Sequence, residues 1–386
     1  MTRIVHILHH SPSLFHDEPL YSLLQRSAWH LELARFQQKY LPRCQVECWT
    51  PERRADRVIE TRVAGVKSLF FPAFGLGYQR EISPSLFEHL SRRLAEFDCI
   101  FLHGSVSYFS SLLLGRFGHR VRIVVQNHGE RTTLTRLCDP NARKPLDYWL
   151  RVWLERRALA KAHRLLCLNA DNIEDYLRNG VPESKLVLST MGVDLASFHP
   201  LAETKPTLRS ALGLPAADYY LGFVGRLAPE KQVDKLIDAL AHLPSNVRLL
   251  VVGDGRLRGA LMRQSGRLAA GAVHFVGSVS DRARLNRFYN ACDLLVLPSK
   301  SEGFGMVRVE SLAAGTNVRA SELAGPRALL GDGDCGSLSR ARDASELATE
   351  IRAALASPTH PQQLVARARR YSWQSVCARH AAILAA

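Results

Sequence analysis

Two glutamates flank a Gly-Phe-Gly turn in the segment PSKSEGFGMVRVESLAAG, residues 298–315. A buried carboxylate costs several kcal/mol unless a partner holds it, so Glu302 and Glu310 either face solvent or bind a ligand. The pattern predicts a helix that begins near Met306, with Glu302 in the preceding loop and Glu310 about one turn into the helix. Free N–H groups at a helix start attract anions, so this segment suits a ligand with phosphates and hydroxyls. The alternative is that Glu310 only offsets the helix dipole and Glu302 is solvated.

A second candidate site lies in FVGRLAPEKQVDKLIDAL, residues 223–240, where a predicted strand ends at Gly225. The glycine allows a tight turn, and the cations Arg226 and Lys231 follow beside a predicted helix start. Two cations at such a position form an anion site, although solvated loop charges are the ordinary alternative. Gly253, in LLVVGDGRL, could let a ligand approach the backbone, but a plain tight turn is favoured because one Gly-x-Gly is a weak signal.

The elements that must position these residues alternate between short β-rich runs and helix-like stretches, which predicts β-α-β units and parallel sheets. The predicted strands are RIVHILHH, QVECWT, DCIFLHG, RIVVQNHG, RLLCLNA, KLVLSTMG, YYLGFVGR, VRLLVVGDG, AVHFVGS and DLLVLPS. The predicted helices include residues 23–40, 83–96, 146–162 and 232–243. Runs that are apolar on both faces, such as DLLVLP, are typical of sheets covered by helices on both sides.

The alternating pattern starts twice, and the Pro- and Ala-rich segment 198–218 interrupts it. We therefore predict an α/β protein of two doubly wound, Rossmann-like domains with a boundary near residue 200. Two such domains would face each other across a cleft at the carboxyl ends of their sheets, where open α/β sheets bind ligands.

Composition limits the functional classes. The chain of 386 residues is 46% hydrophobic and carries a net charge of +15 that is spread along its length. Such an excess suits nucleic acid, an anionic membrane surface or phosphorylated small molecules, and a generally basic proteome explains it equally well. Three cysteines, Cys99, Cys167 and Cys292, lie in apolar runs, and the pair Cys44 and Cys48 has no second pair to complete a zinc site. We expect a reduced, cytoplasmic setting without a signal peptide or membrane span.

Together these motifs resemble retaining nucleotide-sugar glycosyltransferases of the GT-B fold, especially glycosyltransferase family 4 (glycosyl transferases group 1). Glu302 and Glu310, with seven residues between them, are similar to the E-x7-E signature, and FVGRLAPEK is similar to the G-R-x-x-x-E-K loop. Further similarity lies in STMGVDLASFHP, in RYSWQSVCARHAAIL and in the block VHFVGSVSDRARLNRFYNACDLLVLPSKSEGFGMVRVESLAAG. The resemblance implies an acceptor-binding domain over 1–200, a nucleotide-sugar-binding domain over 201–369, and a helix over 370–386 that crosses back to the first domain.

The resemblance also implies roles in donor binding. Arg226 and Lys231 would hold the diphosphate and stabilise the leaving nucleotide diphosphate. Glu310 would accept hydrogen bonds from ribose hydroxyls, Glu302 would bind the transferred sugar, and the amides of residues 304–307 would contact sugar or phosphate. The donor-binding set is Gly225, Arg226, Lys231, Gly253, Val276, Glu302, Phe304, Gly305, Met306, Val307 and Glu310.

The implied catalytic set is Glu302, His128, Arg226 and Lys231. His128, in VVQNHG at a predicted strand end, matches the family histidine near the sugar, and the alternative is a capping or satisfied histidine. Because cations and a helix dipole meet the phosphate charge, no metal is needed, and no cofactor is expected beyond the donor. The implied reaction retains the anomeric configuration. The acceptor would attack on the leaving-group side through an oxocarbenium-like state, with the leaving phosphate as a candidate base.

Four departures from the family pattern surround the donor. The loop HHSPSLFHDEP after the first strand has no glycine, although its histidines and Ser11 or Ser13 could substitute. Asn317-Val318-Arg319 replaces Pro-Val-Val, Ala324-Gly325 replaces Gly-Gly, and Met191 replaces the asparagine of N-G-V-D. These changes indicate a divergent donor or a reduced activity.

The acceptor should depend on the first domain, where aromatic residues gather in FFPAFGLGYQRE, SVSYFSS and DYWLRVWLERRALAKAHR. The last of these segments predicts a basic, aromatic helix that could rest on an anionic membrane and present a lipid-linked glycan acceptor. The favoured alternative is that Trp149, Trp153 and Leu154 pack in the core while the arginines are solvated.

Three functional hypotheses follow. The first is a cytoplasmic, peripherally membrane-bound, retaining transferase that uses a UDP- or GDP-sugar for a cell-surface polysaccharide or glycoconjugate. The second is a nucleotide-sugar epimerase or a phosphorylase of the same fold. The third is a non-catalytic protein that binds nucleotide sugar or nucleic acid. The sequence shows no nucleic-acid-binding motif and no basic face interleaved with aromatics, so no nucleic-acid partner is expected.

Overall fold

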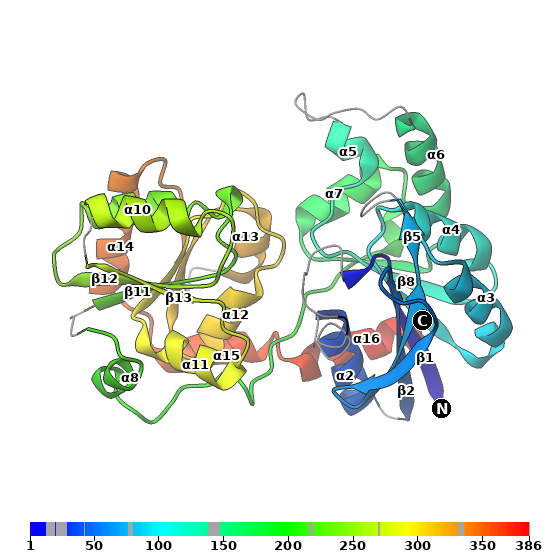
Figure 1. The fold of residues 1–386 in the computed structure, drawn as a ribbon, viewed down its shortest axis with the longest axis horizontal. Coiled ribbons are helices and arrows are strands. Elements are labelled where there is room, and N and C mark those ends of the chain that lie inside the picture. Colours follow the sequence, from blue (N-terminus) through cyan, green and yellow to red (C-terminus); the bar gives the residue numbers. More distant parts are fainter. Residues whose placement is uncertain are drawn as a thin grey trace. The chain divides into compact units, whose positions relative to one another are not determined.

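A computed structural model of the chain describes residues 1–12, 20, 29–41, 43–75, 80–137, 147–215, 219–268, 271–330 and 336–385. The chain forms two compact units, which we call the N-terminal domain (residues 1–191 and 376–386) and the C-terminal domain (residues 192–375). Each domain is built around its own sheet (Figure 1). The chain leaves the N-terminal domain after Met191 and returns to it at Val376, whereas the sequence placed these points near 200 and 370.

The N-terminal domain has an eight-stranded sheet in the order β10-β9-β8-β7-β1-β2-β4-β3. Its pairs are parallel except that β3 runs antiparallel to β4. The strands are β1 (Thr2–Leu8), β2 (Cys44–Glu52), β3 (Ile59–Val63), β4 (Val66–Pro72), β7 (Cys99–His103), β8 (Arg122–Gln126), β9 (Arg164–Cys167) and β10 (Leu186–Leu188), and β5 (Phe74–Gly75) pairs with β6 (Glu81–Ile82) outside the sheet. Every residue of β7 is buried, as expected for a central strand covered on both faces.

Helices cover both faces of this sheet, with α3, α4 and α6 on one side and α2 and α16 on the other (Figure 1). The helical elements are α2 (Trp29–Tyr40), α3 (Pro84–Arg93), η2 (Leu94–Glu96), α4 (Tyr108–Phe117), α5 (Thr133–Leu137), α6 (Tyr148–Leu159), α7 (Ala170–Arg178), η3 (Glu183–Lys185) and α16 (Trp373–Ala385). The core beneath α3 and α4 contains the large buried side chains Trp49, Phe71, Phe109 and Phe117. These contacts bury the apolar faces that the sequence pattern predicts.

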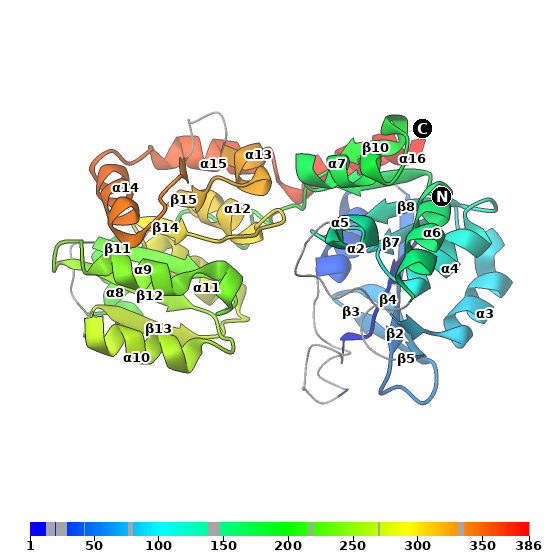
Figure 2. The ribbon, with the colours of Figure 1, turned by 90° about the horizontal axis from the view of Figure 1, so that it is seen from above.

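The C-terminal domain has a six-stranded, fully parallel sheet in the order β13-β12-β11-β14-β15-β16. Its strands are β11 (Tyr219–Val224), β12 (Val247–Val252), β13 (Val273–Gly277), β14 (Leu294–Leu297), β15 (Asn317–Ser321) and β16 (Ser337–Ser339). Its helical elements are α8 (Lys205–Ala211), η4 (Pro229–Lys231), α9 (Val233–Leu240), α10 (Arg258–Leu268), α11 (Arg282–Ala291), α12 (Met306–Ala313), α13 (Ala324–Leu330), α14 (Ala344–Ala356) and α15 (Pro361–Arg369). Helices α10 and α14 lie on one face of this sheet and α8, α11 and α15 on the other (Figures 1 and 2).

The prediction of two parallel, helix-covered sheets is confirmed, but it omitted the mostly buried strand β4 and several strands with polar sequences. Strand β3 is the antiparallel edge of a hairpin whose two-residue turn, Ala64-Gly65, has positive φ angles of 49° and 82°. Such a turn matches the twist of the flanking strands. In the C-terminal domain the prediction missed β15, whose residues alternate between half-buried and buried, and the three-residue strand β16.

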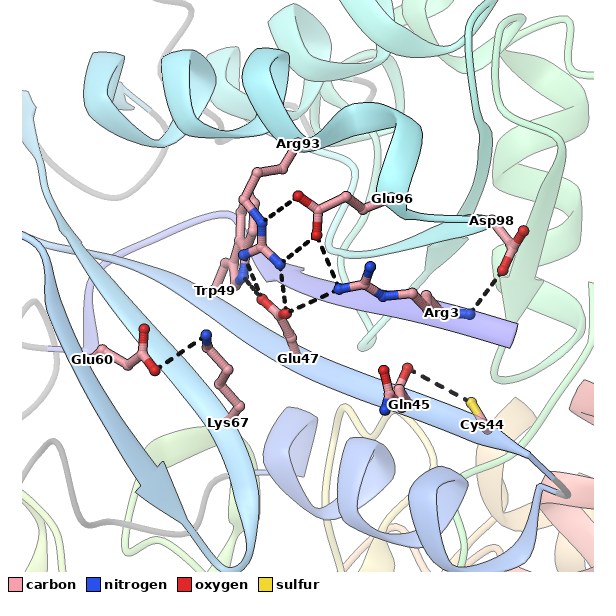
Figure 3. A network of polar contacts seen from close by, with 10 residues as sticks. All are labelled: Arg3, Cys44, Gln45, Glu47, Trp49, Glu60, Lys67, Arg93, Glu96 and Asp98. Atoms are coloured by element: carbon pink, nitrogen blue, oxygen red, sulfur yellow. Dashed lines mark hydrogen bonds and ion pairs between the residues drawn. The ribbon is translucent and has the colours of Figure 1, made fainter. Parts of the chain in front are cut away.

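The amino end of the N-terminal sheet holds a paired ionic cluster (Figure 3). The Arg93 guanidinium donates to both carboxylate oxygens of Glu47 at 2.8 and 2.9 Å and also contacts Glu96, which pairs with Arg3. Although burial opposes ionisation, these bonds and one from Trp49 Nε1 hold the pKa of Glu47 below its usual value. Because every carboxylate here has a guanidinium partner, we assign this cluster a structural role.

Within the described part of the chain, no helix combines the length and the apolar character needed to cross a bilayer.

Candidate active site

The candidate residues of the C-terminal domain lie in loops that follow the carboxyl ends of its strands. Arg226 and Lys231 follow β11, Gly253 follows β12, Val276 lies at the end of β13, and Glu302 follows β14. Since all strands of this sheet are parallel, these positions share one edge. This edge is where doubly wound sheets bind ligands.

The structure brings Lys231 and Glu302 into direct contact. Lys231 Nζ donates to Glu302 Oε2 at 2.7 Å, and the two side chains are only 19% and 13% exposed. Their loops are held together by a backbone bond of 2.8 Å from the Lys300 N–H to the Glu230 carbonyl. A cation and an anion that lie 71 residues apart in sequence therefore form one largely buried pair at the sheet edge.

Arg226 differs from Lys231 in its exposure. Its side chain is 73% exposed, and Nη2 contacts Glu230 Oε1 at 3.1 Å. An exposed pair four residues apart contributes little to stability, so the guanidinium is available to an incoming anion.

The glycines of this edge pack the loops against one another. A Cβ built on Gly253 would overlap the carbonyl oxygen of Gly225, and one built on Gly255 would meet the backbone of Leu227. Backbone bonds link Gly225 N–H to Val252 O and Gly253 N–H to Gly277 O, at 3.0 and 2.8 Å. The structure therefore gives Gly253 a loop-packing role, in keeping with the tight turn that the sequence favoured.

Helix α12 begins at Met306, as predicted, after Gly305 in the left-handed conformation with φ 71°. Phe304 is buried against Tyr371, with ring centroids 5.8 Å apart, while Met306 and Val307 are half-buried. The left-handed N-cap favours glycine because a side chain there is strained. A Cβ on Gly305 would also overlap the guanidinium of Arg308.

Arg308 is a buried cation that the sequence prediction missed. Its side chain is 1% exposed, Nη2 donates to the Phe304 carbonyl, and Nε has no hydrogen-bond partner. Burial lowers its pKa to about 10, while the charge of Glu302 acts in the opposite direction. Arg308 thus remains charged at neutral pH, and no carboxylate of the described residues lies within ion-pair distance.

Glu310 is held by a residue that the sequence prediction also missed. The buried hydroxyl of Tyr289, on α11, donates to Glu310 Oε2 at 2.7 Å. Burial raises the pKa of Glu310, and the Tyr289 bond and the charge of Arg282 offset part of that rise. The sequence carried a signal, because Asn286, Tyr289 and Asn290 are polar residues at helical spacing on one buried face.

His128 lies in the N-terminal domain directly after β8 and is half-buried. Its Nε2 contacts Nδ1 of the buried His103 at 3.1 Å. Burial lowers the pKa of His128 to about 3, so this imidazole is neutral at physiological pH. A neutral imidazole can both donate and accept a hydrogen bond, which suits a sugar hydroxyl.

The described part of the glycine-free loop after β1 is held by two carboxylates. Ser11 donates to Glu81 through its N–H at 2.6 Å and through its hydroxyl, and His9 Nε2 pairs with Glu130 at 3.2 Å. Burial would lower the pKa of His9, but Glu130 raises it. Of the residues predicted to substitute for glycine, Ser11 is buried and Ser13 lies outside the described residues.

The structure gives the surroundings of two of the other departures, Arg319 and Met191. Arg319 donates to the carbonyls of Leu338 and Glu350, each at 3.0 Å, and so ties β15 to its neighbours. Met191 is buried at the end of the N-terminal domain. Among the described residues, no group of histidine, cysteine, aspartate and glutamate side chains could hold a metal ion.

The favoured interpretation of helix α6 was wrong. Trp149 is 73% exposed, Leu150 53% and Trp153 51%, whereas the helix buries Tyr148, Val152, Ala158 and Leu159. Helix α6 packs against α4 and buries these side chains instead of the tryptophans. An exposed pair of tryptophans with neighbouring arginines therefore remains on the surface.

Comparison with known proteins identifies both domains. Residues 204–371 match the family "Glycosyl transferases group 1", and residues 30–197 match "Glycosyltransferase Family 4". The D-inositol 3-phosphate glycosyltransferase of Xylanimonas cellulosilytica is 33% identical over 241 residues, which cover 59% of this chain and 58% of that protein. That of Mycobacterium tuberculosis is 32% identical over 240 residues, covering 60% and 48%. The matched region thus spans about half the length of these curated relatives.

Solved structures share the fold over the whole chain. Anabaena HepE in complex with UDP superposes with a TM-score of 0.76 at 19% identity, with full coverage of both chains. WaaG, a glycosyltransferase involved in lipopolysaccharide biosynthesis, superposes with a TM-score of 0.72 at 19% identity and covers 99% of each chain. At this identity the likeness concerns the fold, which is GT-B.

Proposed function

The chain belongs to the group 1 glycosyltransferases of the GT-B fold, and from this premise we propose that it transfers a sugar with retention from a UDP- or GDP-sugar to a glycan or a lipid-linked glycan. The observation that carries the proposal is the Lys231–Glu302 pair at the carboxyl edge of the C-terminal sheet. It places a cation for a diphosphate and an acceptor for sugar hydroxyls in one largely buried position. The start of α12 and Glu310 follow in the same segment.

Each residue has a proposed role in donor binding. Lys231 and the exposed Arg226 bind the diphosphate, and the amides of Phe304, Gly305, Met306 and Val307 contact phosphate or sugar. Glu310, oriented by Tyr289, accepts hydrogen bonds from the ribose hydroxyls. Gly225, Gly253 and Val276 complete the proposed donor-binding edge, and the absence of a side chain at Gly253 lets its loop pack against Gly225. Glu302 and His128 bind hydroxyls of the transferred sugar.

The proposed reaction needs no protein nucleophile. The bond between the anomeric carbon and the diphosphate oxygen breaks, and the acceptor oxygen forms the new bond on the same face. The acceptor proton passes to the leaving phosphate. Lys231 and Arg226 stabilise the charge that develops on the diphosphate, which is where fixed cations accelerate a reaction most.

A donor screen tests the proposal directly. We expect UDP or GDP to raise the melting temperature of the protein, because a ligand that binds only the folded state stabilises it. Turnover with the matching sugar nucleotide should give a product whose anomeric configuration, measured by proton NMR, equals that of the donor. An inverted product would refute retention. An altered sugar nucleotide formed without acceptor, or a strict need for inorganic phosphate, would favour an epimerase or a phosphorylase instead.

Substitution of Lys231 tests the observation that carries the proposal. We expect Lys231→Met to lower kcat by about 100- to 1,000-fold, the usual effect of removing one preorganised electrostatic group. Lys39→Met, at an exposed lysine on α2, is the matched control and should leave turnover unchanged. Turnover of Lys231→Met within a factor of two of the wild type would contradict the assigned role.

The acceptor side of the proposal rests on helix α6. Trp149, Leu150 and Trp153 are exposed, and the Arg157 guanidinium lies 4.8 Å from the Trp153 ring centroid. Aromatic and basic side chains on one helix favour binding at the surface of an anionic bilayer, where a lipid-linked acceptor would be found. We therefore propose a peripheral contact of the protein with the cytoplasmic face of a membrane.

Vesicle sedimentation tests this contact. The protein should sediment with phosphatidylcholine vesicles that contain phosphatidylglycerol, and Trp149→Ser with Trp153→Ser should abolish the binding. Met262→Ser, at an exposed apolar side chain on α10, serves as the control. Equal binding of all three proteins, or none by the wild type, would contradict the membrane contact without affecting the donor screen.

A further inference from the structure

A continuous chain of hydrogen bonds joins His128 to the C-terminal helix through the interior of the N-terminal domain. His128 Nε2 lies 3.1 Å from His103 Nδ1, and His103 Nε2 lies 2.8 Å from His6 Nδ1. His6 Nε2 then lies 2.9 Å from Oε1 of Gln37, and Gln37 Nε2 lies 3.1 Å from Nδ1 of His380 on α16. We call His128, His103, His6, Gln37 and His380 the histidine chain.

The members of the histidine chain come from distant parts of the sequence. They lie on β1, on α2, at the end of β7, after β8 and on α16 (Figure 1). Four of the five side chains are fully buried, and His128 at the end of the chain is half-buried. One more hydrogen bond extends the histidine chain beyond His380, because His380 Nε2 lies 2.9 Å from the Ser189 hydroxyl. A buried polar network of this kind is stable only when each member finds a partner.

The four imidazoles are neutral under physiological conditions. Burial lowers the pKa of His6 to about 4 and the pKa values of His128 and His380 to about 3. The pKa of His103 is also far below its usual value, because burial and the neighbouring imidazoles both oppose its charge. A neutral imidazole carries a proton on one ring nitrogen only, so it donates from one side and accepts on the other.

This restriction fixes which member of each pair in the histidine chain is the hydrogen-bond donor, and the assignment starts at the Gln37 amide. Its Oε1 can only accept, so His6 carries its proton on Nε2 and accepts at Nδ1. His103 must then donate from Nε2 to His6 and accept at Nδ1, and His128 must donate from Nε2 to His103. On the other side the Gln37 NH2 group can only donate, so His380 accepts at Nδ1 and carries its proton on Nε2.

We propose that Gln37 is a positioning residue that sets the tautomer of His128 through His6 and His103, so that the His128 ring carries its proton on Nε2. The inference deepens the proposed function, in which His128 binds the transferred sugar, and it rests on that function for the identity of the ligand. The tautomer itself is a property of the protein without any ligand. A second partner on one ring nitrogen commonly fixes the chemistry of the other, as it does in metal sites and catalytic triads.

The test is a nitrogen-15 NMR spectrum of the full-length protein labelled at histidine, recorded at pH 8 without ligand. Two-bond couplings to the ring protons distinguish the Nε2–H tautomer from the Nδ1–H tautomer. Single substitutions such as His128→Gln assign the signals. We expect His6, His103, His128 and His380 all to be Nε2–H. An Nδ1–H form at His6, His103 or His128 would overturn the proposal, and because no donor is present, this failure is distinct from a failure of the donor screen.

Two substitutions of Gln37 then test its control of the chain. Gln37→Glu keeps an acceptor beside His6, so His128 should remain Nε2–H. Gln37→Met removes both hydrogen bonds at similar volume, and we expect both tautomers of His103 and His128 to become populated together. The control is Gln38→Met, at the exposed next residue of the same helix, which should leave the spectrum unchanged. A folded Gln37→Met protein that keeps a single Nε2–H form at His128 would overturn the proposal. If Gln37→Met does not fold, the wild-type and Gln37→Glu spectra still decide it.

Discussion

The carboxyl ends of the two sheets differ in the polar side chains that they bury, although each contains an ion pair, His9–Glu130 in one and Lys231–Glu302 in the other. In the N-terminal domain, the histidine chain consists of neutral imidazoles that form hydrogen bonds with one another and with Gln37. In the C-terminal domain the same edge keeps its groups charged, with Lys231 paired to Glu302 and Arg308 buried beneath the turn before α12. A buried polar group must be neutralised, paired or supplied with a ligand, and the two domains use different solutions.

Under the proposed function, this difference suits the two parts of a sugar nucleotide. A diphosphate carries charge and gains most from fixed cations and free amides, which are the groups proposed to bind it in the C-terminal domain. A sugar carries only hydroxyls, for which the neutral imidazole of His128 is a proposed partner. Three perturbations should therefore affect the two domains differently. They are mild acid, a glycine substitution and the removal of a buried cation.

The largest expected effect is that mild acid destabilises the N-terminal domain selectively. His6, His128 and His380 have folded pKa values of about 4, 3 and 3, below the unfolded value of about 6.5. As the pH falls below 6.5 the unfolded chain binds protons that the folded domain cannot, so stability is lost. Each such histidine contributes about 1.4 kcal/mol per pH unit, and two of them would remove about 3 kcal/mol between pH 6 and 5.

Two groups of the same domain act in the opposite direction. Glu130 raises the folded pKa of His9, so the contribution of His9 is complete at low pH and is lost as the pH rises. Burial likewise raises the pKa of Glu155 to about 7. Hydrogen exchange can be measured by mass spectrometry at pH 7 and 5.5 and corrected for intrinsic rates. Between these two pH values, β1, β7 and β8 should lose more protection than β11, β12 and β14. An equal loss of protection in both sheets would contradict the comparison.

The next largest effect concerns how the loops pack. A Cβ on Gly253 would overlap the backbone carbonyl of Gly225, whereas one on Gly104 would meet the imidazole of His9. Both glycines have positive φ angles, 133° and 93°. A side chain can move aside but a neighbouring backbone cannot, so Gly253→Ala should cost about 3 kcal/mol of unfolding free energy and Gly104→Ala less.

Urea unfolding of each variant measures this difference. Gly266, within α10, is the matched control because a Cβ there meets nothing within 4 Å and its φ is ordinary. Gly266→Ala should stabilise the protein by about 0.5–1 kcal/mol through the higher helix propensity of alanine. If Gly104→Ala proved as costly as Gly253→Ala, the two edges would not differ in how their loops are held.

Most regular, buried elements were predictable from sequence, with β4 as an exception, and residues defined by tertiary contacts were not. Strands such as β7 and β14 are apolar on both faces, and the start of α12 at Met306 follows from the glycines before it. Strands β3 and β15 lie at or near the edge of their sheets, and their sequences contain too few apolar residues to predict a strand. The exposed Trp149 was misplaced because either face of α6 offers apolar side chains, and only the packing against α4 selects one.

The same distinction holds at the site. Glu302, Glu310 and Lys231 were chosen as candidates from residue type and spacing, but the Lys231–Glu302 contact joins loops 71 residues apart and has no local signal. Tyr289 carries a faint signal as a polar residue on a buried helix face. The histidine chain joins five separate segments, and no periodicity in any of them predicts that they meet.

Substitution of Arg308 should have the smallest effect on stability. It is also the most specific test, because the substitution should raise the stability of the free protein and weaken its response to UDP. In the protein without ligand its buried charge has no carboxylate partner among the described residues, and burial depresses its pKa. Replacing such a charge by an apolar side chain is often stabilising, and we expect Arg308→Leu to raise the unfolding free energy by about 1–2 kcal/mol. An anion bound at the start of α12 would supply the missing partner. The increase in melting temperature caused by UDP should therefore be smaller in Arg308→Leu than in the wild type.

Arg319→Leu is the control that separates this coupling from a general effect of removing a buried arginine. Arg319 donates to two backbone carbonyls and its Nε lies 3.8 Å from the Glu350 carboxylate, so its charge, unlike that of Arg308, has an anionic partner in the protein. Its loss should lower stability, because it leaves those acceptors unpaired, and should leave the increase caused by UDP unchanged. Differential scanning fluorimetry with and without UDP measures both quantities for both variants. If Arg308→Leu lowered the stability of the free protein and kept the full response to UDP, Arg308 would be an ordinary structural arginine like Arg319, and the C-terminal edge would owe its anion affinity to Lys231, Arg226 and the α12 amides alone.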